Sequence, residues 1–321
     1  MSRAVRDSGS DSTSSPVSFR RATGSLRQPA AHRLVEASAP NDPNAGARFL
    51  HVAELNGIDL SQLWITMHDR ERRIREACLC VPGAGRTGMF FMGRPADAAR
   101  ERELTSLIEH VCKRVRRRTV LAQALLAADE APVERALVAA GFRQIGPLSY
   151  LQRPTPVSAS EIEARDVPSE LACDPWQPGD DPDLKIALEG SYIDTLDCPE
   201  LCGLRSMDDV IASHRATGSS DEDTWWIIRK AGRPVGAMLF NIMSEQSAIE
   251  LVYMGLSPEI RGGGVGSALL SQGLRALAGR PERVVTCAVD QRNDPARRLY
   301  ARFGFMETGM RMACIRDLRS R

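Results

Sequence analysis

The most constraining feature of this sequence is a segment that occurs twice. DEAPVERALVAAGF at residues 129–142 aligns with RNDPARRLYARFGF at residues 292–305. Pro132 aligns with Pro295, and the aligned positions lie 163 residues apart (295 − 132). In both copies a proline opens a helical pattern and a glycine ends it. The sequence therefore predicts an internal duplication, with two similarly folded halves in one chain.

The length and composition suit two globular domains. The chain has 321 residues, 43% of them hydrophobic and 26% charged, with a formal net charge of +1. This near-neutral balance gives no field that would attract nucleic acid or an anionic membrane. No apolar stretch approaches the length of a membrane helix, and the N-terminus lacks the apolar core of a signal peptide. We expect a cytoplasmic protein without a nucleic-acid or membrane partner.

The cysteines and histidines do not follow metal-binding spacings. Cys198 and Cys202 form a C-x3-C pair, but no second Cys/His pair at zinc spacing stands nearby. The chain has eight cysteines in total, which is unremarkable at this length. We expect reduced thiols and no metal site.

Composition divides the chain into four parts. Residues 1–45 are rich in Ser, Arg, Pro and Ala, which predicts a disordered tail. A first domain is expected over 46–155. A Pro- and Ser-containing linker follows over 156–167, and a second domain is expected over 168–321.

Hydrophobic periodicity gives a coarse order of elements in each half. In the first half it predicts strands at 48–55, 63–69, 75–83, 87–93 and 119–127, and helices at 96–118 and 132–142. In the second half it predicts a strand at 170–176, helices at 183–193 and 206–216, and a hairpin at 224–242.

A glycine-rich segment stands between a strand pattern and a helix pattern in the second half. MGLSPEIRGGGVGSALL occupies residues 254–270. The first turn of a helix presents N–H groups without intrahelical partners, and glycines let a phosphate approach them. The positive charge of Arg261 would add to this potential. The segment lacks the Lys-Ser/Thr of a P-loop and the third glycine of the dinucleotide-binding motif, so, taken alone, a flexible turn remains an alternative.

Two motifs in this half resemble those of the GNAT superfamily of N-acetyltransferases. RGGGVG at residues 261–266 is similar to the acetyl-CoA motif R/Q-x-x-G-x-G/A. VVTCAVDQRNDPARRLYARFGF at residues 284–305 is similar to the second motif, a strand and an Asn followed by L-Y-x-x-x-G-F. The resemblance covers residues 168–321 closely and residues 48–155 in outline.

The resemblance implies an α/β fold of two tandem GNAT-like domains. Each would be a splayed, mostly antiparallel mixed sheet flanked by helices, with acetyl-CoA wedged between two central parallel strands of the second. It implies cofactor contacts from Met254, Leu256, Arg261, Gly262, Gly263, Gly264, Val265, Gly266, Ser267 and Asn293.

The first half departs from these motifs. Where the second half has RGGGVG, Ala98–Glu103 read AARERE, with no glycine and two carboxylates that would repel a pyrophosphate. Tyr300 corresponds to Leu137, and Asn293 to Glu130. We expect the first half to keep the fold without the ligand, and the chain to be a monomer that acts as an internal pseudo-dimer.

The resemblance also implies roles in catalysis. Tyr300 would protonate the leaving thiolate, although a core tyrosine is the alternative. Glu250 would be the general base. It lies six residues before Leu256, and even spacing puts both on one face if no bulge intervenes. The N–H of Leu256 would stabilise the carbonyl oxygen. Glu245 and His214 are alternative bases.

The acceptor is the least determined part. In the family it lies between the first two helices and the sheet, here residues 180–216. Acidic side chains in that stretch would attract a cationic amine or face solvent: Asp194, Asp197, Glu200, Asp208 and Asp209. We expect an N-acetyltransferase that uses acetyl-CoA and an amine of a small molecule or peptide. The alternative is a module that senses acyl-CoA without turnover.

Overall fold

The computed structural model describes residues 17–68 and 73–319. Its first half consists of β1 (Val17–Arg21), α1 (Arg27–Val35), α2 (Ala45–Leu55), β2 (Leu63–His68), β3 (Ile74–Gly83), β4 (Thr87–Met92), α3 (Ala98–Val115), β5 (Leu121–Leu126), α4 (Ala131–Ala139) and β6 (Arg143–Pro154). Its second half consists of β7 (Leu171–Pro175), α5 (Asp181–Tyr192), α6 (Met207–Ala216), β8 (Ser219–Lys230), β9 (Arg233–Met243), β10 (Ala248–Leu256), α7 (Val265–Ala276), β11 (Val284–Asp290), α8 (Asp294–Arg302) and β12 (Met306–Asp317).

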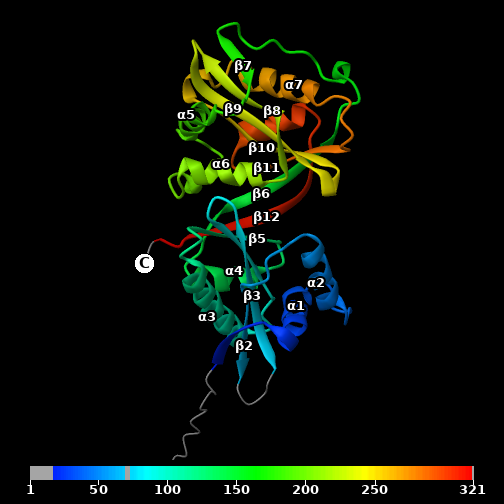
Figure 1. Cartoon of the computed structure of the whole chain (residues 1–321), viewed down its shortest axis with the longest axis vertical. Coiled ribbons are helices and arrows are strands. Elements are labelled where there is room, and N and C mark those ends of the chain that lie inside the picture. The colour runs from blue at the N-terminus through cyan, green and yellow to red at the C-terminus, as the bar shows by residue number, and fades with distance from the viewer. Residues whose placement is uncertain (1–16, 69–72, 320–321) are drawn as a thin grey trace, which may run out of the picture.

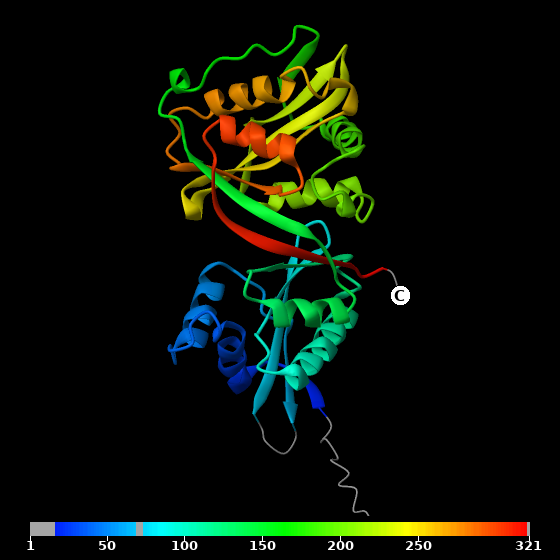
Figure 2. The same cartoon turned by 180° about the vertical axis from the view of Figure 1, so that it is seen from behind.

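The described strands form one continuous 12-stranded sheet through both halves (Figures 1 and 2). The strand order is β1-β2-β3-β4-β5-β12-β6-β11-β10-β9-β8-β7. The two central strands are exchanged: β12 pairs with β5 of the first half, and β6 pairs with β11 of the second. Each half therefore takes its innermost strand from the other half, and neither half has a complete sheet alone. The boundary predicted at residue 155 therefore separates β6 from the sheet that it completes.

The pairing of β6 with β12 has an internal two-fold symmetry. Leu148 pairs with Arg311 at the centre, and these residues are 163 positions apart, the offset of the sequence repeat. The pair Gln152–Met306 at one end is the counterpart of Arg143–Ile315 at the other. Even the register shifts fall at symmetric positions, so the duplication seen in the sequence is also visible in the hydrogen-bond register.

Helices cover both faces of the sheet. In the second half, α7 and α8 pack on one face, where Leu269 and Leu274 join a core that includes Phe240. Helices α5 and α6 cover the opposite face, where Leu188 packs in a core that includes Trp225. In the first half, α3 and α4 lie over one face and α1 over the other. The predicted mixed α/β architecture is confirmed.

The structure corrects two predictions near the N-terminus. The expected strand at 48–55 is part of helix α2. The prediction of disorder over residues 1–45 is wrong for 17–45, because β1 pairs along β2 and α1 is anchored by buried Ala30, Ala31 and Leu34. Each alanine buries little surface area, and the segment has few large apolar residues. Its composition therefore did not indicate that it forms a packed helix. Residues 1–16 lie outside the described part of the chain.

No helix within residues 17–68 and 73–319 is long and apolar enough to cross a membrane.

Candidate functional site

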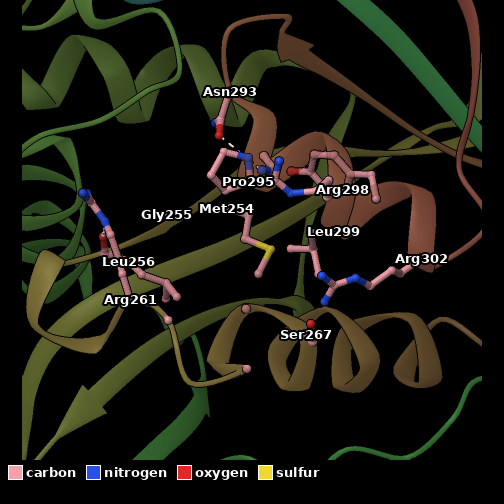
Figure 3. Close-up of a pocket in the computed structure, with 15 residues that line it drawn as sticks. Met254, Gly255, Leu256, Arg261, Ser267, Asn293, Pro295, Arg298, Leu299 and Arg302 are labelled. Atoms are coloured by element: carbon pink, nitrogen blue, oxygen red, sulfur yellow. Dashed lines mark hydrogen bonds between the residues drawn. The ribbon is translucent and has the colours of Figure 1, made fainter.

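The sheet opens between β10 and β11. These strands run parallel but pair only where Ala248–Glu250 meet Val284–Thr286. Farther along, β10 continues to Leu256 with ladder pairing to β9 alone. The backbone groups on its other edge face a cavity of about 390 Å³ between β10, α7 and α8 (Figure 3). The predicted splay is therefore present, and it has room for a ligand.

The glycine loop has the geometry of an anion-binding site. Gly262, Gly263 and Gly264 have φ values of +84°, +56° and +84°, a region that favours glycine. Gly264 is the N-cap of α7 and provides no side-chain cap. In the described part of the chain, the N–H groups of Gly266 and Ser267 make no hydrogen bond, so they are available to a ligand. A pyrophosphate fits this arrangement of N–H groups and helix dipole.

Arg261 lines the cavity, as expected for a cofactor contact, but its hydrogen bonds go elsewhere. Its guanidinium does not extend over the glycines. It donates to the carbonyl oxygens of Ser191 (2.9 Å), Ile193 (2.6 Å) and Asp194 (3.0 Å), at the C-terminal end of α5. Its Nε donates to the carbonyl of Leu256, 2.9 Å away. The side chain thus fastens the α5 end to the end of β10.

Asn293 and Tyr300 both line this cavity from α8. Asn293 is the N-cap of the helix, and its Oδ1 accepts a hydrogen bond of 3.2 Å from the N–H of Ala296 (Figure 3). Tyr300 is buried, with its ring edge-to-face on Phe305 at 5.5 Å between centroids. Burial raises the pKa of the Tyr300 phenol well above its usual value, so it remains a proton donor at neutral pH.

Two arginines that we did not predict also line the cavity. Arg298 and Arg302 project from α8, and Arg302 extends toward Ser267 at the start of α7 (Figure 3). Their spacing of four residues places them on one helix face. That spacing in ARRLYAR, together with the nearby glycine loop, was the signal available in the sequence.

A second cavity of about 630 Å³ adjoins the first on the α5–α6 side. Both are lined by Met254, Leu256, Asn293 and Tyr300. Tyr300 therefore lies where the two spaces meet. The second cavity occupies the place where the family resemblance located the acceptor.

The acidic residues of this stretch have different environments. Asp194 and Asp197 line the second cavity. Glu200 forms an ion pair with Arg292 at 2.7 Å, and Asp208 forms one with Lys185 at 2.6 Å. Asp209 does not line the cavity either. Only the first two carboxylates are placed to meet an acceptor there.

The proposed base does not share a face with Leu256. A register shift between Leu251 and Tyr253 inserts an extra residue into β10. Leu251 and Leu256 both pack in the core under α7 and α8, so Glu250, next to Leu251, points to the α5–α6 face. We expected Glu250 and Leu256 to share a face because they lie an even number of positions apart. That prediction is wrong because the bulge lies between these two residues. Glu250 lines neither cavity, and burial raises its carboxyl pKa.

The two alternative bases differ from each other. Glu245 is exposed in the short 3-10 helix Ser244–Gln246 and lines neither cavity. His214 lines the second cavity, and burial lowers the pKa of its imidazole to about 4. Its Nε2 is buried without a hydrogen-bond partner in the described part of the chain. His214 is therefore neutral at pH 7 and has an unsatisfied polar atom.

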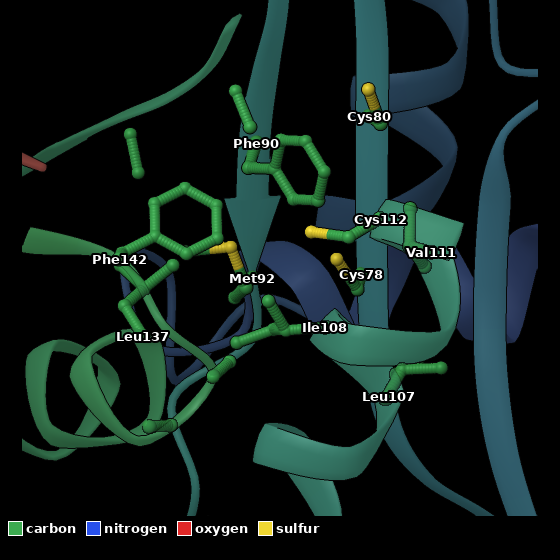
Figure 4. Close-up of a cluster of buried hydrophobic side chains, with 14 of the residues drawn as sticks. Cys78, Cys80, Phe90, Met92, Leu107, Ile108, Val111, Cys112, Leu137 and Phe142 are labelled. Carbon is green, nitrogen blue, oxygen red and sulfur yellow. The ribbon is translucent and has the colours of Figure 1, made fainter. Parts of the chain in front are cut away.

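In the first half, side chains fill the space where the second half has its cavity. Strands β4 and β5 are also parallel and pair over a short length, where Thr87–Met89 meet Leu121–Gln123. Beyond this point Phe90 packs edge-to-face on Phe142, with ring centroids 5.5 Å apart, and Leu137 lies beside them (Figure 4).

The start of helix α3 differs from the start of α7 as well. The side chain of Asp97 caps it by accepting the N–H of Arg100 at 2.9 Å. An anion there would meet a carboxylate instead of free N–H groups.

Comparison with known proteins agrees with this geometry. Residues 192–305, within the second half of this chain, match the Acetyltransferase (GNAT) family. The whole fold resembles the crystal structure of a GCN5-related N-acetyltransferase from Sphaerobacter thermophilus. The TM-score is 0.60 at 18% sequence identity, over 95% of this chain and 97% of that one. This chain therefore shares the overall fold of that structure across both of its halves.

Among curated proteins, the similar sequences are mycothiol acetyltransferases. The one from Kineococcus radiotolerans is 34% identical over 181 residues, 55% of this chain and 56% of the relative. The one from Streptomyces bingchenggensis is 28% identical over 163 residues, 51% of this chain and 49% of the relative. The chain spans about half the length of the curated relatives that it matches.

Proposed function

We propose that the second half is an N-acetyltransferase that moves an acetyl group from acetyl-CoA directly to an amine. The observation that carries this proposal is the position of Tyr300. Its buried phenol lies where the cavity beside the glycine loop meets the cavity under α5 and α6. A proton donor is thus placed between the space for a cofactor and the space for an acceptor. The names of the curated relatives also support acetyl transfer.

The residues that are present fit acetyl-CoA. The free N–H groups at the start of α7 would hold its pyrophosphate, with Arg298 and Arg302 close to the phosphates. The open edge of β10 from Tyr253 to Leu256 would pair with its pantetheine amides as an added strand does. When bound, acetyl-CoA supplies an acetyl group already activated as a thioester. We propose one such site per chain, because side chains fill the corresponding space of the first half.

Side chains of the protein then accept and donate the protons that move during acetyl transfer. A carbon–nitrogen bond forms to the amine as the carbon–sulfur bond breaks. The amine proton passes to Glu250 through water, since this carboxyl lies on the acceptor side of β10 but lines neither cavity. The Tyr300 hydroxyl donates its proton to the departing sulfur. The N–H of Leu256 is the group proposed to stabilise the carbonyl oxygen.

The test is thiol release from acetyl-CoA by the full chain with a panel of small-molecule and peptide amines, beside a calorimetric titration of CoA. Release that depends on one class of amine is expected. Binding of CoA with no release for any amine would support the alternative, a sensor of acyl-CoA, and would overturn the proposed enzyme.

We also propose that the chain works as a monomer in the cytoplasm. The exchanged strands β6 and β12 already join its halves as a dimer interface would. Every cysteine in the described residues is a free thiol, as in reducing compartments. Light scattering should give a mass near 35.2 kDa, and a mass twice as large would contradict the monomer.

A further inference from the structure

The second cavity contains a cation as well as carboxylates. Arg205 lines it and is partly buried. Its Nη1 donates to the Ser213 hydroxyl at 2.6 Å and to the carbonyl oxygen of Gly85 at 3.4 Å. Both partners are neutral, and within the described residues no carboxylate lies within ion-pair distance of this guanidinium. The charge of Asp209 acts on Arg205 only from beyond ion-pair distance. A half-buried cation whose hydrogen-bond partners are all neutral is a ready site for an anion.

The first half holds this cation in place. Gly85, in the turn between β3 and β4, has φ +64° and packs so tightly on α6 that a Cβ would lie 1.9 Å from the carbonyl oxygen of Asp209. The Ser213 hydroxyl also donates to the carbonyl of Ala84 at 3.0 Å. Arg205 is thus fixed by contacts from both halves, which gives the first half a defined role at the acceptor cavity.

A carboxylate lines the same cavity. Asp197 accepts a hydrogen bond of 2.8 Å from the N–H of Asp290 at the end of β11. Burial is the main cause of the raised pKa of Tyr300, and the charge of Asp197 adds to it. Burial likewise dominates the lowered pKa of His214, and the charge of Arg205 adds to that. The hydrogen bond to Asp290 places Asp197 at the end of β11, and the hydrogen bond to Ser213 places Arg205 beside α6.

Resting on the proposed function, we propose that the acceptor is an amine that also carries an anionic oxygen group, a carboxylate or a phosphate. The anionic group binds Arg205, and the amine lies beside Asp197 and Tyr300. The buried Nε2 of His214, which lacks a partner, lies on the same cavity wall and gains a polar neighbour from such a molecule. A neutral or purely cationic amine would leave the guanidinium without an anionic hydrogen-bond partner.

The experiment uses the full chain and matched pairs of amines. Amino acids and longer amino carboxylates are compared with their amides, and phosphoethanolamine with ethanolamine. We expect kcat/KM to be roughly tenfold or more higher for the anionic member of at least one pair, since a site built for a polar group discriminates against its absence. The carboxylate and phosphate arms show which oxygen group is preferred.

The variant Arg205→Met should remove this preference by raising KM for the anionic amine, while the Kd for CoA stays unchanged. Arg205→Lys should restore part of it. Arg135→Met is the matched control, because Arg135 forms an exposed ion pair with Glu101 in the first half.

Calorimetry with CoA present separates this inference from the proposed function. Binding of the anionic amines that depends on Arg205, without thiol release, would support the inference while the enzyme proposal fails. Acetylation of neutral amines at equal or higher kcat/KM would overturn the inference while the enzyme proposal stands. Failure of every anionic amine both to bind and to react, or a preference that survives Arg205→Met, would also overturn it.

Discussion

The Nη2 atom of Arg261 lies 2.6 Å from the carbonyl oxygen of Ile193, so the residue that precedes the glycine loop is bonded to the end of α5. The same guanidinium also bonds the carbonyls of Ser191 and Asp194. Ser191 and Asp194 line the second cavity. The glycine loop and the second cavity are therefore joined by one side chain, and we expect a change at one to affect the other.

This contact predicts the effect of Arg261→Met. Loss of the carbonyl bonds should lower the free energy of unfolding by about 1–2 kcal/mol and raise KM for the acceptor more than the Kd for CoA. Arg233→Met, which removes only an exposed ion pair with Glu259, should leave both unchanged. If instead the Kd for CoA rises tenfold and the acceptor KM does not, the guanidinium acts mainly on phosphate.

The glycine loop predicts the loss of cofactor binding in Gly264→Glu. Gly264 has φ +84°, and a carboxylate there would oppose a pyrophosphate. Calorimetry should detect no CoA binding to this variant, whereas the unchanged protein should bind one CoA per chain. Gly57→Glu is the matched control, since Gly57 has φ +60° with open space around it in the first half. A stoichiometry near two for the unchanged chain would contradict a single site.

A buried ionic cluster predicts the cost of losing Glu76. This fully buried carboxylate accepts hydrogen bonds from Arg33 (2.6 Å) and Arg100 (2.5 Å), which joins α1 and α3 to β3. Glu76→Ala should lower the free energy of unfolding by about 3–5 kcal/mol, because two arginines lose their buried partner. Glu101→Ala, which removes an exposed ion pair, is the control and should change the free energy of unfolding by under about 1 kcal/mol. Denaturant titration measures both variants. Equal effects would show that burial of this cluster contributes nothing.

The sequence predicted what depends on local pattern. The glycine loop and the helix opened by Pro295 follow from residues close together in the chain, and the duplication follows from two such local patterns repeated 163 residues apart. It could not predict the exchange of β6 and β12, because both exchanged and unexchanged pairings satisfy the same strand patterns. The bulge in β10 and the carbonyl bonds of Arg261 were missed for a similar reason, since they depend on contacts made only in the folded chain.

The position of Glu250 predicts a shifted pH dependence. A general base must be deprotonated, and burial raises the pKa of this carboxyl. The acid limb of kcat should therefore lie above the range of an ordinary glutamate. Glu250→Gln should lower the rate by roughly 10²-fold at low pH and recover as free amine becomes abundant at high pH. Glu245→Gln, at an exposed site, is the control, and an unchanged profile in Glu250→Gln would move the base to His214.

Tyr300 provides the most direct test of chemistry at the junction of the cavities. Leu137 occupies the corresponding position of α4 and is fully buried there. The fold thus accepts an apolar side chain at this position, and the phenolic oxygen of Tyr300 is not needed for packing. Tyr300→Phe should lower kcat by roughly 10²-fold or more, since general acid catalysis is worth about 10²–10⁴.

The affinity for CoA should change little in Tyr300→Phe, because the ring still packs on Phe305. Tyr150→Phe is the matched control, as Tyr150 lies on β6 and lines neither cavity. The kcat of both variants is measured by steady-state kinetics with a substrate whose acetyl transfer is rate-limiting. If Tyr300→Phe keeps the original kcat under that condition, the hydroxyl does not protonate the sulfur and the tyrosine serves the core alone. A fall in kcat with the Kd for CoA intact requires the oxygen itself, since that atom is the only difference between the two side chains.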